Sequence, residues 1–293
     1  MRIVSLLPST TEIVCELGLE VDLVGVTAEC NWPHRVQDGR EVVVRSFADA
    51  AMTPGEIDQF VRQRLDAGLD LYALDDEALR RCDPDLILSQ DLCRVCAVAS
   101  GDVEAATLRL NCHADVLQID PQTLSDVLES IATIATAAHV AQRGIDVVAG
   151  LRGRLANVQS AVRERPRRRV FILEWIDPPF GAGHWVPDLV TAAGGEPILA
   201  CAGERSVSTT WEAITNAQPD VVVVAPCGFG LEQASEQARL VLDRLPDDAE
   251  VWAIDADAVM VRPGPRLVDG VEALASMLHG VGDLPANVVS RIR

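Results

Sequence analysis

Lysine is missing from the chain, and all 25 basic residues are arginine. A chain without lysine cannot form a Schiff base and cannot supply the lysine of a phosphate-binding loop. Cationic side chains are also scarce relative to acidic ones, which leaves a formal net charge of -19. Because nucleic acids and anionic membranes bind clustered cations, neither is an expected partner.

Long apolar runs are missing as well. No stretch approaches the roughly 20 apolar residues that a helix needs to cross a bilayer, so we expect no membrane-embedded segment. Residues 1–8 lack the basic, apolar and small-residue order of a secretory leader. We therefore expect a cytoplasmic protein, with export as the alternative if a leader has been trimmed.

The common catalytic motifs are absent too. The chain contains no G-x-S-x-G, H-E-x-x-H or phosphate-loop pattern, and the glycines at 181 and 183 are too few for a dinucleotide fingerprint. An enzyme would have to use a cysteine nucleophile with His34 or His184, or a metal-activated water. We therefore predict a binding protein and not an enzyme, with no required cofactor.

What the chain does contain is an alternation of short β-branched runs, turn residues and amphipathic helices, which predicts an α/β fold with parallel sheets. The predicted strands are residues 2–7, 23–27, 86–89, 115–119, 169–174, 221–225 and 251–255. The predicted helices are residues 9–17, 54–67, 76–82, 187–193, 210–217, 232–244 and 266–278.

A continuous helical pattern fills the middle of the chain, from residue 123 to about 163, with Gly144 and Gly150 as places where it could break. A helix of 30 to 40 residues would be about 45 to 60 Å long, enough to connect two lobes. The predicted division is an N-terminal lobe (1–122), a connecting helix (123–165), a C-terminal lobe (166–282) and a tail (283–293).

The two predicted lobes repeat one another. Glu77-Ala78 and Glu212-Ala213 each begin a helix, and seven residues later each copy reaches a Pro-Asp pair that leads into an apolar strand. Chance is a weak explanation for this shared spacing. The shared spacing predicts two Rossmann-like lobes that arose by duplication, with a ligand cleft between them.

Candidate ligand contacts lie in the loops that follow the strands, because ligands of open α/β sheets bind beyond the carboxyl ends of the strands. Tryptophan and phenylalanine offer broad faces to a planar macrocycle, while cysteine and histidine are ligands for cobalt, iron or zinc. Capping of the lobe cores is the alternative role for the tryptophans. The candidates are Glu29, Cys30, Trp32 and His34; Gln90, Asp91, Cys93 and Cys96; Glu174, Trp175, Phe180, His184 and Trp185; and Cys227 with Phe229.

Cys93 and Cys96 form the chain's single C-x-x-C motif. This spacing is used by zinc sites and by redox dithiols, so we consider a metal or corrinoid contact, a redox or disulfide pair, and an idle pair. Cys93, Cys96 and His184 are the candidate metal ligands, and Cys30, His34 and Cys227 are the other donors in neighbouring loops.

Taken together, the chain resembles the ligand-binding proteins of ABC transporters for cobalamin, haem and iron-siderophore complexes, whose two α/β lobes are joined by a long helix. The motifs that carry the resemblance are IVSLLPSTTEI (3–13), LVGVT (23–27), the two Pro-Asp strands, DPPF (177–180), GG (194–195) and RPGPR (262–266). It is most similar to the cobalamin-binding members, through FILEW (171–175) and PPF (178–180).

The resemblance implies a monomer that binds a corrinoid, most plausibly cobalamin, or another metal chelate, and that delivers it to an ABC permease. In the family a surface glutamate on each lobe docks into arginine pockets of the permease, and Glu77 and Glu212 match those positions. The alternative is that both glutamates only favour the positive ends of their helices. A cytosolic metal-binding, haem-binding or redox protein that uses Cys93 and Cys96 is the alternative function.

Overall fold

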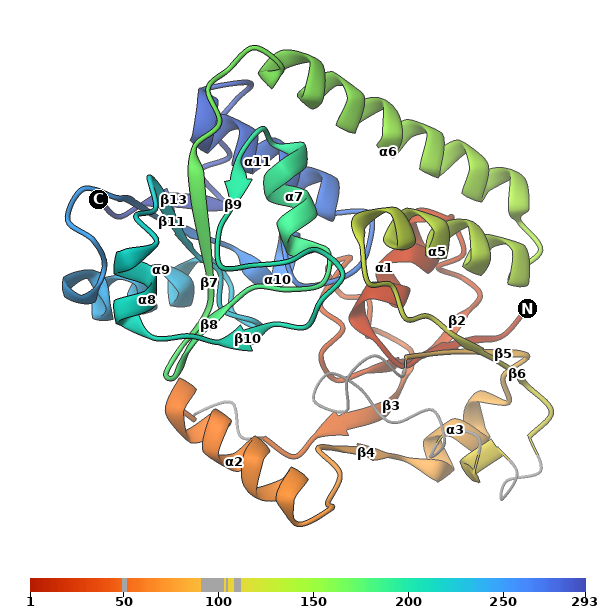
Figure 1. Ribbon diagram of the computed structural model, residues 1–293. Helices are drawn as coiled ribbons and strands as arrows, with labels where there is room; N and C mark the ends of the chain where they lie inside the picture. Colours follow the sequence, from red (N-terminus) through yellow and green to blue (C-terminus); the bar gives the residue numbers. More distant parts are fainter. Residues whose placement is uncertain (49–51, 91–102, 104, 108–111) are drawn as a thin grey trace. The chain divides into compact units, whose positions relative to one another are not determined.

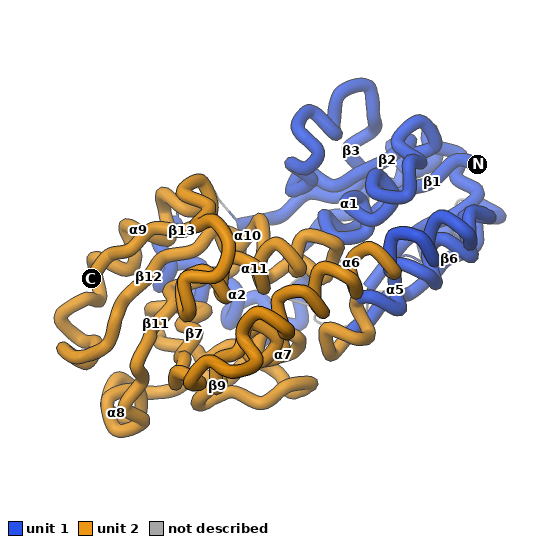
Figure 2. Tube along the Cα trace, turned by 90° about the horizontal axis from the view of Figure 1, so that it is seen from above, with its two compact units in different colours: residues 1–121, 128–148 blue, residues 122–127, 149–293 orange. Residues whose placement is uncertain are grey.

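The computed structural model describes residues 1–48, 52–90, 103, 105–107 and 112–293. The chain divides into two compact units (Figure 2). Unit 1 contains Met1–Pro121 and Leu128–Val148, and unit 2 contains Gln122–Val127 and Ala149–Arg293. Within the described ranges, no helix is long and apolar enough to span a bilayer.

Unit 1 is built on a mostly parallel sheet with the strand order β4-β3-β2-β1-β5-β6 (Figure 1). Its strands are β1 (Ile3–Ser5), β2 (Leu23–Thr27), β3 (Glu41–Ser46), β4 (Tyr72–Leu74), β5 (Leu86–Ser89) and β6 (Asp115–Gln118), and only β4 runs antiparallel to its neighbour. The helices are α1 (Pro8–Glu16), α2 (Pro54–Asp66) and α3 (Asp76–Cys82). The central strands β1 and β5 are buried along their whole length, as expected for a parallel sheet covered on both faces.

Unit 2 repeats this plan with the strand order β10-β8-β7-β11-β12-β13, and β9 pairs with β7. Its strands are β7 (Arg169–Ile176), β8 (Pro179–Gly181), β9 (Glu196–Pro197), β10 (Val207–Ser208), β11 (Val221–Val224), β12 (Glu250–Ile254) and β13 (Val289–Arg291). Its helices are α7 (Val186–Ala192), α8 (Trp211–Asn216), α9 (Leu231–Leu240), α10 (Ala256–Val259) and α11 (Leu267–His279). The predicted α/β class with parallel sheets is confirmed, with antiparallel strands at the edges.

The core of unit 2 follows from the alternation along β7. Phe171 and Leu173 pack in one cluster with Ile214 of α8 and Ala234 of α9. Val170 alternates with Phe171 and points to the other face. There it lies close to Gly195, which is also approached by Val190 of α7 and Leu278 of α11. Figure 1 shows these two helix pairs on opposite faces of the sheet.

The predicted tail (283–293) contains an edge strand of the unit 2 sheet. Residues 289–291 form β13, which runs antiparallel to β12 with Ala253 opposite Ser290. Because backbone hydrogen bonds hold it to the sheet, the chain's last residues belong to unit 2.

The middle of the chain forms two helices and not one. Helix α5 (Leu124–Ala137) and helix α6 (Ala141–Val162) are separated at His139, which has a left-handed φ of 59°. The glycines predicted as possible breaks lie inside α6. Gly144 serves packing there, because a Cβ atom at this position would collide with Ala135 of α5. With 22 residues, α6 is about 33 Å long, and it contributes residues to both units.

A pair of matching contacts, which we call the Arg-Asp staples, explains the repeated Pro-Asp motif. In unit 1 the backbone N–H of Arg2 donates to the Asp85 carboxylate at 2.7 Å, and the guanidinium of Arg2 donates to the carbonyls of Cys82 and Asp83 at the end of α3. Each staple joins the start of the first strand of its unit, β1 or β7, to the end of the helix, α3 or α8. That helix leads into the neighbouring strand of the sheet, β5 or β11.

Unit 2 has the same arrangement. The N–H of Arg169 donates to the Asp220 carboxylate at 2.7 Å, and its guanidinium donates to the carbonyls of Ala217 and Gln218. Asp83 and Gln218, which precede the two Pro-Asp pairs, both have a left-handed φ, of 42° and 48°. The duplication inferred from sequence spacing therefore extends to equivalent hydrogen bonds.

We predict that Asp220→Ala lowers the free energy of unfolding by about 1 kcal/mol, because it removes a charge-assisted hydrogen bond to a partly solvated N–H. Asp85→Ala should have a similar effect in unit 1. Urea unfolding measures both, and Asp248→Ala, at an exposed position, is the control. Equal midpoints for Asp220→Ala and Asp248→Ala would show that the staple contributes nothing.

Candidate functional site

An aromatic pair lies at the carboxyl edge of the unit 2 sheet. Trp175 is near the end of β7, opposite Phe180 of β8, and Phe229 follows β11. The rings of Trp175 and Phe229 have centroids 5.8 Å apart with an interplanar angle of 33°. Both side chains are half-buried, so part of each ring faces solvent. We call Trp175 and Phe229 the aromatic pair.

Glu174 precedes Trp175 on β7, and its backbone and side chain both form hydrogen bonds. Its backbone carbonyl accepts the N–H of Cys227, and its carboxyl accepts a hydrogen bond from the Ser206 side chain. Burial raises the pKa of Glu174 to about 7, against the lowering effect of the Ser206 hydrogen bond. The carboxyl is thus poised between its neutral and ionised forms near neutral pH.

We predict that Glu174→Gln stabilises the protein more at high pH than at low pH. The pKa of Glu174 rises from 4.5 to about 7 on folding, so the wild type loses stability as the pH increases through that window. Glutamine does not titrate. The gain should be near zero at pH 4.5 and about 1 to 2 kcal/mol at pH 8, after allowance for partial exposure.

Urea unfolding at several pH values measures this difference. The control is Glu236→Gln, which removes an exposed carboxylate from α9. A gain for Glu174→Gln that does not change between pH 4.5 and pH 8 would contradict the assigned pKa.

His184 lies against the backbone of residues 203–206, the segment that also contains Ser206. It has a left-handed φ of 50°, its carbonyl accepts the N–H of Gly203 at 3.0 Å, and its N–H donates to the Glu204 carbonyl. Gly183 allows this approach, because a Cβ atom there would collide with the backbone of the same segment. Burial, together with the nearby charge of Arg205, lowers the pKa of His184, and its buried Nε2 atom has no hydrogen-bond partner among the residues that the structure describes.

Two of the predicted ligand contacts are buried and hydrogen-bonded within the protein. Trp185 is 5% exposed, and its Nε1 donates to the carbonyl of Met260 at 2.8 Å. Cys30 is 1% exposed, and its Sγ lies 3.1 Å from the Thr11 hydroxyl and 3.3 Å from the Thr27 hydroxyl. Direct contact with a ligand would require either side chain to leave these positions, and their assignment as ligand contacts stays a prediction.

The remaining candidates differ in their exposure. Glu29, Trp32, His34 and Cys227 are exposed, and Gln90 at the end of β5 is buried. Asp91, Cys93 and Cys96 lie outside the described residues. In the part of the chain that the structure describes, no group of three or more His, Cys, Asp or Glu side chains could hold a metal ion.

Glu77 and Glu212 occupy equivalent positions. Each is the second residue of its helix, α3 or α8, and each is exposed. The helices are capped by Asp75, which accepts the N–H of Ala78, and by Thr210, which accepts the N–H of Ala213. Helix capping is thus already provided by other side chains.

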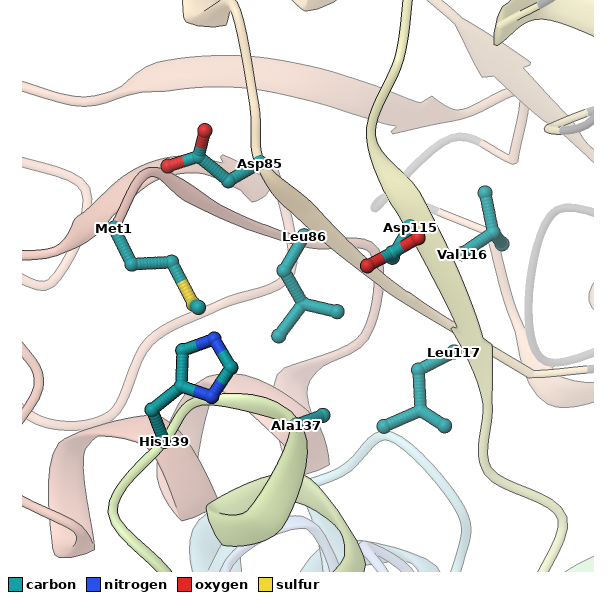
Figure 3. A pocket seen from close by; sticks show the side chains of 8 residues that line it. All are labelled: Met1, Asp85, Leu86, Asp115, Val116, Leu117, Ala137 and His139. Carbon is teal, nitrogen blue, oxygen red and sulfur yellow. The ribbon is translucent and has the colours of Figure 1, made fainter.

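A separate pocket of about 600 Å³ lies in unit 1 (Figure 3). It is at the amino ends of the strands, where Leu86 begins β5 and Asp115 begins β6, and the side chains of Met1 and His139 extend into it. The predicted ligand loops follow the carboxyl ends of the strands, so this pocket is distinct from them.

The described residues thus form two α/β units, and unit 2 carries an aromatic pair at the carboxyl edge of its sheet, where ligands of open α/β sheets bind. Residues 3–256 match the model of the periplasmic binding protein family, and the chain belongs to that family. The predicted family resemblance is confirmed.

Two named relatives illustrate the family. An uncharacterised ABC transporter substrate-binding lipoprotein of Bacillus subtilis is 25% identical over 286 residues, covering 95% of this chain and 80% of the relative. A vitamin B12-binding protein of Vibrio cholerae is 22% identical over 279 residues, covering 94% of this chain and 88% of the relative.

Solved structures support the same fold. A periplasmic haem-binding protein from Pseudomonas aeruginosa has a TM-score of 0.72 at 18% identity, covering 99% of this chain and 97% of that one. The periplasmic vitamin B12-binding protein of Vibrio cholerae has a TM-score of 0.66 at 21% identity, covering 94% and 96%. Since both identities are low, these likenesses establish the fold and leave the ligand to be inferred.

Proposed function

We propose that the protein is the substrate-binding component of an ABC uptake system and that its ligand is cobalamin or another corrinoid. The observation that carries this proposal is the half-exposed aromatic pair at the carboxyl edge of the unit 2 sheet. Half-exposed rings provide a flat apolar surface for a macrocycle. The corrinoid is cargo, so no resident cofactor is proposed.

The named relatives support the role in uptake. One is described as an ABC transporter substrate-binding lipoprotein and another as a vitamin B12-binding protein. The absence of catalytic motifs from the sequence is consistent with binding rather than catalysis.

Delivery requires contact with a permease, and we assign that contact to Glu77 and Glu212. Both carboxylates are exposed at the same position of equivalent helices. Because Asp75 and Thr210 already cap these helices, the two glutamates remain available to arginines on a partner.

Haem is the second candidate ligand, and His184 is the observation that favours it. A neutral imidazole is a common axial ligand of haem iron, and burial lowers the pKa of His184. Its Nε2 atom is covered, however, so coordination through that atom requires the surrounding side chains to move.

A panel of ligands tests the proposal by thermal unfolding. Cyanocobalamin at about 100 times its dissociation constant should stabilise the protein by about 2.7 kcal/mol, which raises Tm by about 4 °C for a chain of this length. Haemin, a ferric siderophore and Zn²⁺ are the comparison ligands. A shift with haemin but not with cyanocobalamin would replace the corrinoid by haem, and no shift with any of them would overturn the proposal.

The cellular location of the protein stays a prediction. A cytoplasmic protein and an exported protein differ in their mature N-terminus and in the cell fraction that contains them. N-terminal sequencing of the native protein after fractionation distinguishes the two, and size-exclusion chromatography with light scattering tests the expected monomer.

A further inference from the structure

The loop between β11 and α9 presents the Phe229 ring of the aromatic pair. Two backbone hydrogen bonds hold the first half of this loop to β7. The N–H of Ala225 donates to the carbonyl of Leu173 at 2.9 Å, and the N–H of Cys227 donates to the carbonyl of Glu174 at 3.3 Å. Because both contacts come before Phe229, they leave the position of its ring to the second half of the loop.

The second half of the loop meets helix α10. Gly228, with a left-handed φ of 79°, turns the chain just before Phe229. The N–H of Asp257, in α10, donates to the carbonyl of Phe229 at 3.3 Å. The next residue is also close to this helix, since a Cβ atom at Gly230 would lie 3.9 Å from a carboxylate oxygen of Asp255. The backbone that carries the Phe229 ring is therefore held by α10.

Helix α10 depends on outside contacts, because four residues are too few for a stable helix on their own. At its start, the side chain of Asp255 accepts the N–H of Ala258 at 2.9 Å. At its end, Nε1 of Trp185 donates to the carbonyl of Met260 at 2.8 Å. Both contacts act at the ends of the helix, whereas Asp257 lies between them.

An ion pair holds Asp257 itself. Its carboxylate accepts a hydrogen bond from the guanidinium of Arg262 at 2.6 Å, and the two side chains are only 20% and 9% exposed. Such a pair resists opening, because separation would leave each charge uncompensated with little access to water. Asp257 thus contacts the backbone of Phe229 through its N–H and contacts Arg262, the first residue of the RPGPR motif, through its carboxylate.

We propose that Asp257 and Arg262 are positioning residues of the ligand site. Their ion pair keeps the Asp257 N–H against the Phe229 carbonyl, and this hydrogen bond holds the Phe229 ring beside Trp175. A ring that is ordered before binding improves affinity, because the cost of ordering it does not fall on the complex. The inference rests on the proposed function, since it concerns the same aromatic pair, and it assigns neither residue a direct contact with the ligand.

Amide hydrogen exchange in the free protein, followed residue by residue by NMR, tests the first step. In Arg262→Gln the amide of Asp257 should exchange about tenfold faster than in the wild type, because its hydrogen bond then opens without breaking an ion pair. The amide of Ala225, which is bonded to Leu173 in the same loop, is the internal reference and should keep its rate. An unchanged rate at Asp257, or an equal acceleration of both amides, would overturn the inference.

A double-mutant cycle with cyanocobalamin tests the second step. Arg262→Gln should raise the dissociation constant about tenfold in the wild type but less than about twofold in a Phe229→Ala background, because a positioning residue acts only through the ring that it positions. Arg262→Lys retains the positive charge and should restore the affinity to within about threefold of the wild type. An equal loss in both backgrounds would show that Arg262 acts by another route and would overturn the inference.

The matched control is Arg168→Gln, which breaks an ion pair at the opposite edge of the same sheet. Arg168 contacts Glu250 at 2.8 Å, where β12 begins, and its replacement should leave the dissociation constant unchanged. If Arg262→Gln does not fold, the variant Asp257→Asn with Arg262→Gln enters the same measurements, because it leaves no charge uncompensated. The same accelerated exchange and the same dependence on Phe229 are expected of it.

The failure of this inference is distinguishable from the failure of the proposed function. If the wild type binds cyanocobalamin and the cycle shows no dependence on Phe229, the protein remains a corrinoid-binding protein that lacks this positioning. If a folded wild type binds no cyanocobalamin, the proposed function fails, and the exchange rate of the Asp257 amide still decides whether the ion pair holds the Phe229 loop.

Discussion

Replacement of both rings of the aromatic pair, in the variant Trp175→Ala with Phe229→Ala, is expected to weaken corrinoid binding by about 100-fold. Buried aromatic anchors commonly contribute 2 kcal/mol or more each to binding, and neighbouring anchors are not fully additive. The two rings lie 5.8 Å apart and both retain solvent-exposed surface, so a ligand can cover them together.

The matched control is Phe47→Ala, which removes an aromatic side chain that is 48% exposed in unit 1. Isothermal titration calorimetry with cyanocobalamin measures all variants, and thermal unfolding verifies that each one is folded. An affinity for the double variant within about threefold of the wild type would show that the ligand does not stack on these rings.

Charge reversal at both predicted docking positions, Glu77→Arg with Glu212→Arg, is expected to reduce ligand uptake on the order of 100-fold while the ligand affinity in solution is retained. Removal of one partner from a desolvated ion pair commonly costs 2 to 5 kcal/mol, and under the proposed docking the reversal also adds repulsion from arginines on the permease. Uptake of radiolabelled cobalamin by cells or proteoliposomes that contain the cognate permease measures the effect.

The alternative role of these glutamates makes a different prediction. If they only favour the positive ends of α3 and α8, each substitution costs about 0.3 to 1 kcal/mol of stability and leaves uptake intact. The control Glu236→Arg places the same charge change on the exposed side of α9. Equal uptake by the double variant and by the control would exclude docking through Glu77 and Glu212.

Features set by short stretches of sequence could be predicted. The sequence predicted these inner strands to within a few residues, because each is a short apolar run bounded by turn residues. They are β1, β2, β5, β7, β11 and β12. The Pro-Asp repeat indicated duplication, and the Arg-Asp staples show that its spacing reflects equivalent hydrogen bonds.

Other features depend on contacts distant in sequence. The expectation that a break in the central helix would occur at glycine was wrong, since His139 adopts the left-handed conformation and Gly144 is required by the approach of α5. Strand β3 contains three consecutive valines and was still not predicted, and β13 depends on pairing with β12.

Side-chain direction was the least predictable part of the site. Trp185 and Trp175 both occupy predicted ligand loops, but a carbonyl 75 residues away holds Trp185 in the interior. The interaction between Glu174 and Ser206 joins two separate segments, and no local pattern indicated it. A loop position identifies candidates, and tertiary packing decides which of them face a ligand.

Isothermal titration of the purified protein with cyanocobalamin tests the central claim most directly. We expect saturable binding of one corrinoid per chain, with micromolar or tighter affinity, accompanied by quenching of tryptophan fluorescence that is reduced in Trp175→Phe. Saturable binding of haemin with no binding of cyanocobalamin, or binding of neither by a folded protein, would contradict it.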